Sequence, residues 1–471
     1  MKKKLLYGGA AVAAVAVSAL MLTASQSQAP EKYDPAIETQ NTIADGFIFA
    51  AVGDITMPLP LAKWGDATFQ EALKPVKASD VAYANLEGSL IDWDDFVGPF
   101  APGANRYGIP DTAADIKEMG FDAIGHANNH AFDYGVEGLL QTNEILEEAG
   151  LVYMGSGKNY GAAWAPRYLM TPKGRVAFVA TTTAMWAQLP SLAGARQESG
   201  EAPGRAGVAQ INVDQSFLVP RSMSGMLEGM KKAFPTGGGL YATVDPDPGQ
   251  ITVMQRKFKY GNVERPEYTY EANKTEVAAA LKSVREGKLK ADFLSFGMHT
   301  HEHRFPEKPD TDPIPGDFLQ PFAHQVIDAG ADQFVGTGVH VLKGIEIYKG
   351  HPIFYGLGEF FRMQDTSRAG AALPGRSDTN SDPIKYEAVV ATTRWQGGKL
   401  AEVRLYPVWL NEADRIALRG APHAASPEQA QKTLKRLQVL SAPYGTKIDI
   451  VDNVGVISLL PPASAPPARR R

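Results

Sequence analysis

Histidines are concentrated in a few short segments of this chain. The sequence has nine histidines among 471 residues, and most of them occupy three windows. These windows contain His126 and His130, then His299, His301 and His303, and finally His340. Histidine titrates near neutral pH and is the commonest protein ligand for transition metals. The clustering therefore predicts a metal-binding or acid–base site assembled from segments that are distant in the sequence.

The segment 125–135 has the greatest density of chemically active side chains. It contains two histidines, two asparagines and Asp133 between a short apolar run and an amphipathic stretch. Loops at the ends of buried strands are where an α/β scaffold usually holds its chemistry. We expect Asn129 and His130 to act directly in a site, and His126 and Asp133 to support the loop by hydrogen bonding.

Apolar runs that end in a polar, metal-capable side chain recur along the chain. Asp54 follows the run 47–52, and Glu87 follows the run 81–84. A continuous apolar run of this kind is typical of a strand that is buried on both faces. Further strands are expected at 122–124, 293–296, 333–335, 386–393 and 400–407, and amphipathic helices at 136–148, 274–286 and 317–329. The alternation predicts an α/β fold of βαβ units, with two packed sheets and helices outside.

The N-terminus has the composition of a targeting segment. Lys2, Lys3 and Lys4 precede the apolar stretch 5–24, which is rich in Ala, Val and Leu. Residues 1–29 are expected to form either a cleaved signal peptide or an uncleaved N-terminal membrane anchor, because about 20 apolar residues can span a bilayer. Both alternatives predict an exported protein that is periplasmic or otherwise extracytoplasmic.

The rest of the chain divides by composition. Residues 30–44 form a polar linker, and 45–460 are long enough for one large domain. Within this domain, 190–270 are rich in Gly, Pro and polar residues and are expected to form an inserted loop-rich region or cap. Residues 461–471 are a Pro/Ala/Arg tail, which is expected to be disordered. The net charge of −5 argues against nucleic acid as a partner, and the absence of cysteine excludes disulfides and thiolate metal sites.

In their order along the chain, these motifs resemble those of the bacterial capsule-synthesis family typified by the CapA protein of poly-γ-glutamate production. The matching segments are Gly53-Asp54, Asn85-Leu86-Glu87-Gly88, Ala127-Asn128-Asn129-His130, Asp133-Tyr134-Gly135, Phe296-Gly297-Met298-His299, His340-Val341 and Gly356-Leu357-Gly358-Glu359-Phe360. That family has a calcineurin-like metallophosphatase fold. The resemblance therefore implies a four-layer α-β-β-α sandwich that is interrupted by the inserted loop-rich region.

The resemblance also implies a role for each matching polar residue. A two-metal hydrolytic site needs carboxylate oxygens, an asparagine and several imidazoles around divalent ions such as Mn, Zn or Fe. Carried over by position, the metal ligands are Asp54, Glu87, Asn129, His299 and His340. Among them, Glu87 stands where the fold places its bridging carboxylate. His130 would act as an acid toward the leaving group.

Two imidazoles of the family pattern are missing from this chain. Thr56 stands where the metallophosphatase signature Asp-x-His has its histidine, and Gly338 replaces the first histidine of the usual Gly-x-His-Pro-His ending. His301 is an additional candidate ligand: it or His303 could supply a lost ligand from another loop, or the second metal could be weak or missing. Glu302 is a candidate catalytic base or substrate contact.

These features predict an exported protein of capsule polymer synthesis or processing that works as a metal-dependent hydrolase through a metal-activated water. The implied substrate is an anionic polymer or phosphoester, which Arg106 and Tyr107 could contact unless they lie on a surface loop. Membrane-bound polymer synthase subunits are the implied partners. The alternative is a non-catalytic envelope accessory subunit with a degenerate metal site. A nucleotide- or sugar-phosphate esterase that shares only the fold is a third reading.

Overall fold

The structure is a computed structural model that describes residues 42–100, 106–183, 193–234, 249–307, 311–363, 382–410 and 418–459. Residues 1–29, nearly all of the linker 30–44 and the tail 461–471 lie outside these ranges, so the predictions made for them stay predictions. Asn41–Arg471 form one compact unit, which contains every element below. None of the helices in the described ranges is long and apolar enough to cross a membrane.

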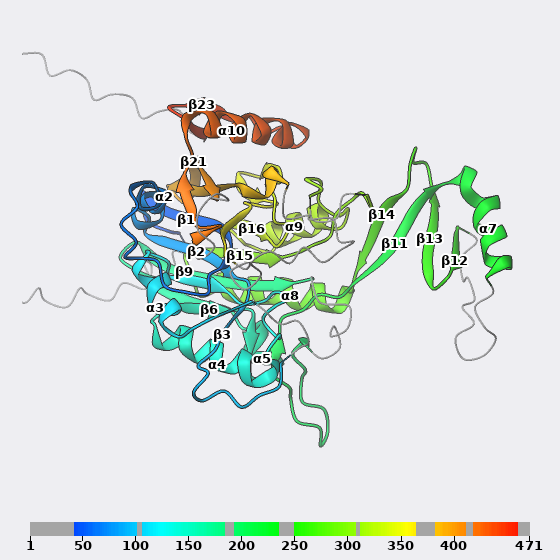
Figure 1. Cartoon of the computed structure of the whole chain (residues 1–471), viewed down its shortest axis with the longest axis horizontal. Helices are drawn as coiled ribbons and strands as arrows, with labels where there is room; N and C mark the ends of the chain where they lie inside the picture. Colours follow the sequence, from blue (N-terminus) through cyan, green and yellow to red (C-terminus); the bar gives the residue numbers. More distant parts are fainter. Residues whose placement is uncertain are drawn as a thin grey trace, which may run out of the picture. The chain divides into compact units, whose positions relative to one another are not determined.

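The first of two large sheets contains ten strands (Figure 1). Its order is β23-β24-β21-β20-β1-β2-β5-β6, with β19 beside β1 and β22 beside β21. The strands are β1 (Phe47–Thr56), β2 (Val81–Leu86), β5 (Ala123–Gly125), β6 (Val152–Met154), β19 (Glu359–Arg362), β20 (Glu387–Gln396), β21 (Lys399–Leu410), β22 (Pro422–Ala424), β23 (Asp449–Val451) and β24 (Val454–Ser458). Because β1, β2, β5 and β6 are parallel while β20 and β21 are antiparallel, the sheet is mixed.

The second sheet contains six strands in the order β17-β18-β16-β15-β9-β8. They are β8 (Arg167–Thr171), β9 (Gly174–Thr182), β15 (Phe293–His299), β16 (Gln333–Thr337), β17 (Ile345–Tyr348) and β18 (His351–Phe354). The central strands β9, β15, β16 and β18 are parallel, so their carboxyl ends lie at one edge of the sheet.

Alternating side chains of β1 connect the layers. Phe47 and Phe49 pack against Phe293 of the second sheet, with ring centroids 5.2 and 5.6 Å apart, whereas Ala50 and Val52 face helices. Helices α2 (Ala67–Lys77), α3 (Asp111–Glu118) and α4 (Gly135–Glu148) cover the outer face of the first sheet. Helices α5 (Tyr160–Trp164), α8 (Lys274–Lys288) and α9 (Leu319–Asp328) cover the outer face of the second. The predicted four-layer α-β-β-α sandwich is confirmed.

The described part of the inserted region contains regular structure as well as loops. Strands β11 (Val213–Pro220), β12 (Gln250–Val253), β13 (Arg256–Gly261) and β14 (Glu267–Ala272) form a separate sheet, and α7 (Ser224–Ala233) packs on it. Phe217 and Phe258 stack with ring centroids 5.0 Å apart across two of these strands. Residues 190–192 and 235–248 of the region lie outside the described ranges.

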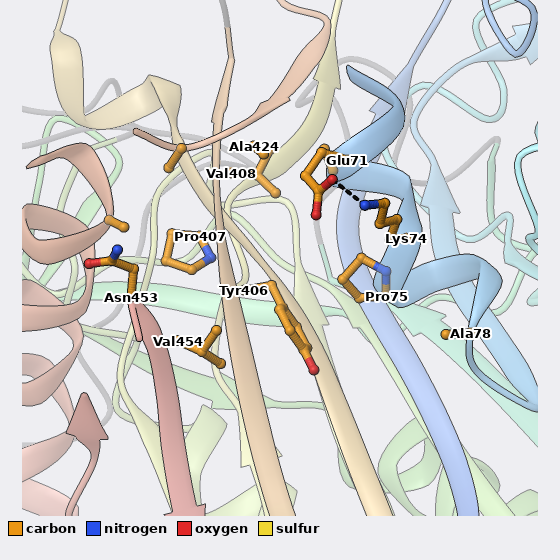
Figure 2. A pocket seen from close by; sticks show the side chains of 13 residues that line it. Glu71, Lys74, Pro75, Ala78, Tyr406, Pro407, Val408, Ala424, Asn453 and Val454 are labelled. Atoms are coloured by element: carbon orange, nitrogen blue, oxygen red, sulfur yellow. Dashed lines mark ion pairs between the residues drawn. The ribbon is translucent and has the colours of Figure 1, made fainter. Parts of the chain in front are cut away.

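A groove of about 390 Å³ lies between α2, β21 and the start of α10 (Pro427–Ser441) (Figure 2). Pro75, Tyr406 and Pro407 contribute to its lining, and Glu71 pairs with Lys74 at 2.5 Å on its α2 side. None of its lining residues is one of the predicted site residues. The chemistry of this chain must therefore be sought elsewhere, at the carboxyl ends of the parallel strands.

Candidate metal centre

The predicted site residues converge because parallel strands of both sheets end at the same place. Asp54 in β1 is in register with Asn85 in β2, and Asn85 is in register with Gly125 at the end of β5. In the second sheet, His299 at the end of β15 is in register with Thr337 at the end of β16. Buried side chains from four strand ends therefore face one region, as expected for sites of α/β folds.

Tyr83 fills the space between the two sheets just below this region. Its side chain is buried, and its hydroxyl approaches the α-carbons of Gly125 and Gly297, where a Cβ atom would collide with the phenol. Burial, with a smaller contribution from the Asp54 carboxylate, raises the pKa of Tyr83. The two glycines therefore allow an uncharged phenol to support the site from below.

Glu87, His301 and His340 form the group best suited to bind a cation. One potential ligand atom of each lies within 4.8 Å of the others. Glu87 is completely buried; its Oε1 pairs with Arg106, whereas its Oε2 has no hydrogen-bond partner in the described part of the chain. A buried carboxylate oxygen without a partner is costly, and a cation bound at Oε2 relieves that cost. A carboxylate with two imidazoles is a ligand set typical of Zn, Mn or Fe, so the residues present fit a divalent metal.

A second group of predicted ligands forms a hydrogen-bonded network. Asp54 Oδ1 accepts from Asn85 Nδ2 at 2.8 Å and lies 3.3 Å from His299 Nδ1. Asn129 Oδ1 lies 2.8 Å from His299 Nε2, which is itself 3.2 Å from His301 Nε2. His299 thus connects the carboxylate of Asp54 to the amide of Asn129 and touches the His301 imidazole.

His130 is oriented by Asp133. Its Nδ1 lies 2.7 Å from Asp133 Oδ2, and its Nε2 lies 3.9 Å from Glu87 Oε1. Burial, together with the positive charges of Arg106 and neighbouring imidazoles, holds the pKa of His130 well below its ordinary value. Because an ionised carboxylate only accepts hydrogen bonds, the proton of neutral His130 lies on Nδ1 and the lone pair on Nε2 points toward Glu87.

The two imidazoles of the cation-binding group differ in their electrostatics. Loss of hydration and the nearby His340, His299 and Arg106 lower the pKa of His301 well below its usual value, which favours the neutral form that binds metals. Burial would also lower the pKa of His340, but the Glu359 carboxylate outweighs it and raises that pKa. His340 Nδ1 lies 3.2 Å from Glu359 Oε1. The His301 side chain is 27% exposed, so solvent reaches this side of the centre.

Glu302 and His303 lie beside the cluster. The Glu302 carboxylate accepts hydrogen bonds from the hydroxyls of Thr183 (2.6 Å) and Thr300. His303 Nδ1 lies 3.1 Å from the His301 carbonyl oxygen, and its ring contacts Tyr268 of β14. Of the two residues that could replace a lost ligand, the structure therefore brings His301 into the cluster and places His303 against the inserted sheet.

The positions of the two missing imidazoles are filled by other contacts. The Thr56 hydroxyl donates a long, weak hydrogen bond to the Glu87 carbonyl oxygen, at 3.4 Å. The backbone N–H of Gly338 donates to Asp54 Oδ2 at 2.8 Å, with φ at +94°. A Cβ at Gly338 would lie 2.7 Å from the Thr300 carbonyl oxygen. The backbone at this position therefore leaves no room for a histidine.

Two arginines lie at the centre: Arg106, which was expected either to contact an anionic substrate or to lie on a surface loop, and Arg362, which was not predicted. Arg106 is buried and pairs with Glu87, so it does not lie on a surface loop. Arg362 pairs with Glu359, and the two residues are the last and first of β19. Burial would raise the pKa of the Glu359 carboxyl group, but the nearby Arg362 and His340 outweigh burial and lower it. Asn85 lies two residues before Glu87 at the end of β2, and this spacing was a sequence signal for Asn85. Nothing in the local sequence indicates Arg362.

The remaining histidines have structural partners. His126 Nδ1 lies 2.9 Å from Asn143 Oδ1 and 3.1 Å from Ser156 Oγ, and it links the segment 125–135 to α4. Burial lowers the pKa of His126 to about 4, so the ring is neutral. His324 pairs with Glu346, and His351 lies next to the Asp332 carbonyl oxygen. These residues stabilise loops and helices outside the cation-binding group.

Comparison with known proteins identifies the family of this chain. The profile of the family described as bacterial capsule synthesis protein PGA_cap matches residues 48–364. A protein of Sinorhizobium fredii designated y4sH is 36% identical over 460 residues, which are 91% of this chain and 96% of that protein. The capsule biosynthesis protein CapA of Bacillus anthracis is 25% identical over 75% of this chain and 68% of its own. A phosphatase crystal structure from Mycoplasma pneumoniae is similar over 84% of this chain and 100% of its own, with 10% identity and a TM-score of 0.36. The chain belongs to the PGA_cap family of bacterial capsule synthesis proteins.

Proposed function

We propose that this protein is an exported, metal-dependent hydrolase that acts on an anionic polymer or phosphoester during synthesis or processing of a capsule polymer. Poly-γ-glutamate is the polymer that the family name indicates. A divalent ion supplies charge stabilisation and an activated water when bound. The observation that carries the proposal is the buried Glu87 carboxylate, which lies beside two imidazoles and whose Oε2 has no hydrogen-bond partner in the described part of the chain.

The residues around that group have separable roles in the proposal. Glu87, His301 and His340 hold the cation, while Asp54, Asn129 and His299 fix the geometry from the adjoining network. His130 accepts a proton from the attacking water at Nε2 and returns it to the leaving group, because Asp133 holds the other ring nitrogen. Glu302 positions the segment that carries His301 through its hydrogen bonds to the two threonines.

The location and partners of the protein are part of the same proposal. The N-terminal segment 1–29 would deliver the domain to the periplasm or the outer side of the membrane, as a signal peptide or as an anchor. There it would meet membrane-bound polymer synthase subunits. Cell fractionation with a periplasmic marker enzyme, combined with N-terminal sequencing of the mature protein, tests both statements.

One structural observation favours a second function. Thr56 and Gly338 stand where the family pattern has imidazoles, and the geometry at Gly338 excludes one. On this alternative, the protein is a non-catalytic accessory subunit of a polymer synthase, and its metal site stabilises a binding surface. The Bacillus anthracis relative, a capsule biosynthesis protein by name, is compatible with both functions.

Turnover separates these alternatives. The protein, purified without chelator, is assayed with Mn²⁺ or Zn²⁺ on an aryl phosphodiester and on poly-γ-glutamate. We expect hydrolysis by the wild type and loss of it in Asp54→Ala, Asn129→Ala and Glu87→Gln. Glu71→Gln is the matched control, because Glu71 pairs only with Lys74 on α2, remote from the centre. A folded, metal-loaded wild type that hydrolyses neither substrate supports the accessory function instead.

A further inference from the structure

The chain fixes Arg106 against Glu87 through its backbone as well as its side chain. The Arg106 side chain is 9% exposed, and its Nη1 pairs with Glu87 Oε1. The Arg106 carbonyl oxygen accepts from Ser89 N–H at 3.0 Å, just before β4 (Tyr107–Gly108) pairs with β3 (Ser89–Leu90). The segment containing Glu87 therefore holds Arg106 at both ends of the residue. This guanidinium is a built-in part of the centre.

The donors that a second cation would need are missing or engaged. Thr56 and Gly338 supply no imidazole, as described above. Both carboxylate oxygens of Asp54 already have partners, Asn85 and His299 at Oδ1 and the Gly338 amide at Oδ2. Asn129 and His299 are likewise joined to each other. These residues therefore hold one another in place, and Glu87, His301 and His340 remain as the group that can converge on an ion.

We propose that the Arg106 guanidinium takes the place of one cation of a two-metal centre, so that this chain binds a single divalent ion through Glu87, His301 and His340. The proposal rests on the proposed metal centre but not on hydrolysis. A guanidinium is always charged and presents several donors in a plane, so it can neutralise one side of a carboxylate and face an anionic substrate at the same time.

The buried charges are balanced by one ion rather than two. Four carboxylates, Asp54, Glu87, Asp133 and Glu359, are buried at the centre together with the guanidiniums of Arg106 and Arg362. These six groups carry an excess of two negative charges, which equals the charge of one divalent ion. A second ion would leave uncompensated positive charge in a buried site, which is strongly unfavourable.

Metal stoichiometry tests the proposal independently of activity. The full chain is stripped with chelator, and binding of Mn²⁺ and of Zn²⁺ is followed by isothermal titration calorimetry, with bound metal counted by mass spectrometry. We expect one ion per chain in the wild type. Thr56→His, which restores one imidazole, should still bind one ion while Arg106 is present. The double variant Thr56→His/Arg106→Gln should bind two.

Two further variants control for charge and for general damage. Arg106→Lys in the Thr56→His background keeps the positive charge and should return the count to one. Arg436→Gln removes an arginine of α10 that pairs with the fully buried Glu387 of β20, away from the centre. This variant should leave the number of bound ions at one. Two ions in the wild type or in Thr56→His, or one in the double variant, would overturn the proposal. A wild type with one ion and no turnover would overturn only the hydrolase function.

Discussion

Asp133 Oδ2 and His130 Nδ1 lie 2.7 Å apart inside the segment 125–135, and the contact fixes which ring nitrogen of His130 faces the centre. Both side chains are buried, with 4% and 6% exposure, so solvent cannot replace the contact. Within this loop, His130 therefore reaches toward Glu87, whereas Asp133 only orients the His130 ring.

Replacing Asp133 with asparagine should therefore lower activity without removing the metal. The amide can present its NH₂ to Nδ1 and thereby favour the wrong tautomer of His130, so we expect kcat to fall by about 10- to 100-fold. Metal affinity, measured by calorimetry, should change by less than about threefold, because Asp133 belongs to no ligand group. Asp328→Asn, which breaks a surface ion pair with Lys349, is the control. An equal loss of metal affinity and kcat would show that Asp133 acts on the ion.

Gly338→Ala should destabilise the protein more than another substitution at a positive φ. At Gly338 (φ +94°) a Cβ would lie 2.7 Å from the Thr300 carbonyl oxygen, whereas at Gly350 (φ +86°) nothing lies within 4 Å. Both variants carry the backbone strain of about 1 kcal/mol, and only the first must also move Thr300. We expect a loss of about 2–4 kcal/mol for Gly338→Ala in urea unfolding, against about 1 kcal/mol for Gly350→Ala. Equal losses would contradict the close approach.

Much of the sandwich could be predicted from the sequence because its signals are local. Continuous apolar runs marked β1, β2 and β15, and helical periodicity at 136–148 marked α4. The strands β11 to β14 were not predicted, because their faces are only partly buried and the region is rich in turn residues. The stacked Phe217 and Phe258 were the available signal, but they belong to strands far apart in the sequence.

The composition of the centre could be predicted only in part. The histidine windows and the strand-end motifs brought Glu87, His301 and His340 into consideration, and the structure places all three together. Arg106 was considered only as a substrate contact or a surface-loop residue, because its ion pair with Glu87 is a tertiary contact; Arg362 was missed, because a single arginine at the end of a strand has no pattern of its own. Charge balance in a buried site is a property of the folded arrangement, so composition could not supply it.

His126 should make stability depend on pH in acid. Burial lowers its folded pKa to about 4, against about 6.5 in the unfolded chain, so the unfolded chain binds the extra proton between these values. The stabilisation that neutral His126 contributes to folding is therefore fully present above pH 6.5, and it is lost as the pH falls toward 4. The difference in unfolding free energy between wild type and His126→Gln should shrink by about 3 kcal/mol from pH 7 to pH 4. Urea unfolding across this range measures it, and parallel curves would contradict the burial of a neutral imidazole.

The buried pair of Glu87 and Arg106 should behave as a strongly coupled unit in metal-free protein. Removing one partner leaves the other charge buried without compensation, so Glu87→Gln and Arg106→Gln should each cost about 3–5 kcal/mol of unfolding free energy. The double variant Glu87→Gln/Arg106→Gln buries two neutral amides instead, and it should cost less than the sum of the single changes by about 2 kcal/mol or more.

The exposed pair of Lys63 and Glu118, at 3.6 Å, provides the reference cycle. Its coupling should stay below about 1 kcal/mol, because solvent screens both charges. The samples are treated with chelator, so that bound cations do not contribute to the coupling energy measured in either cycle. If the coupling of Glu87 to Arg106 were as small as that of the surface pair, the guanidinium would stabilise the Glu87 carboxylate no more than water does. Its position at the centre would then have no electrostatic basis, whereas a large coupling gives Arg106 the role of a fixed cation in the folded chain.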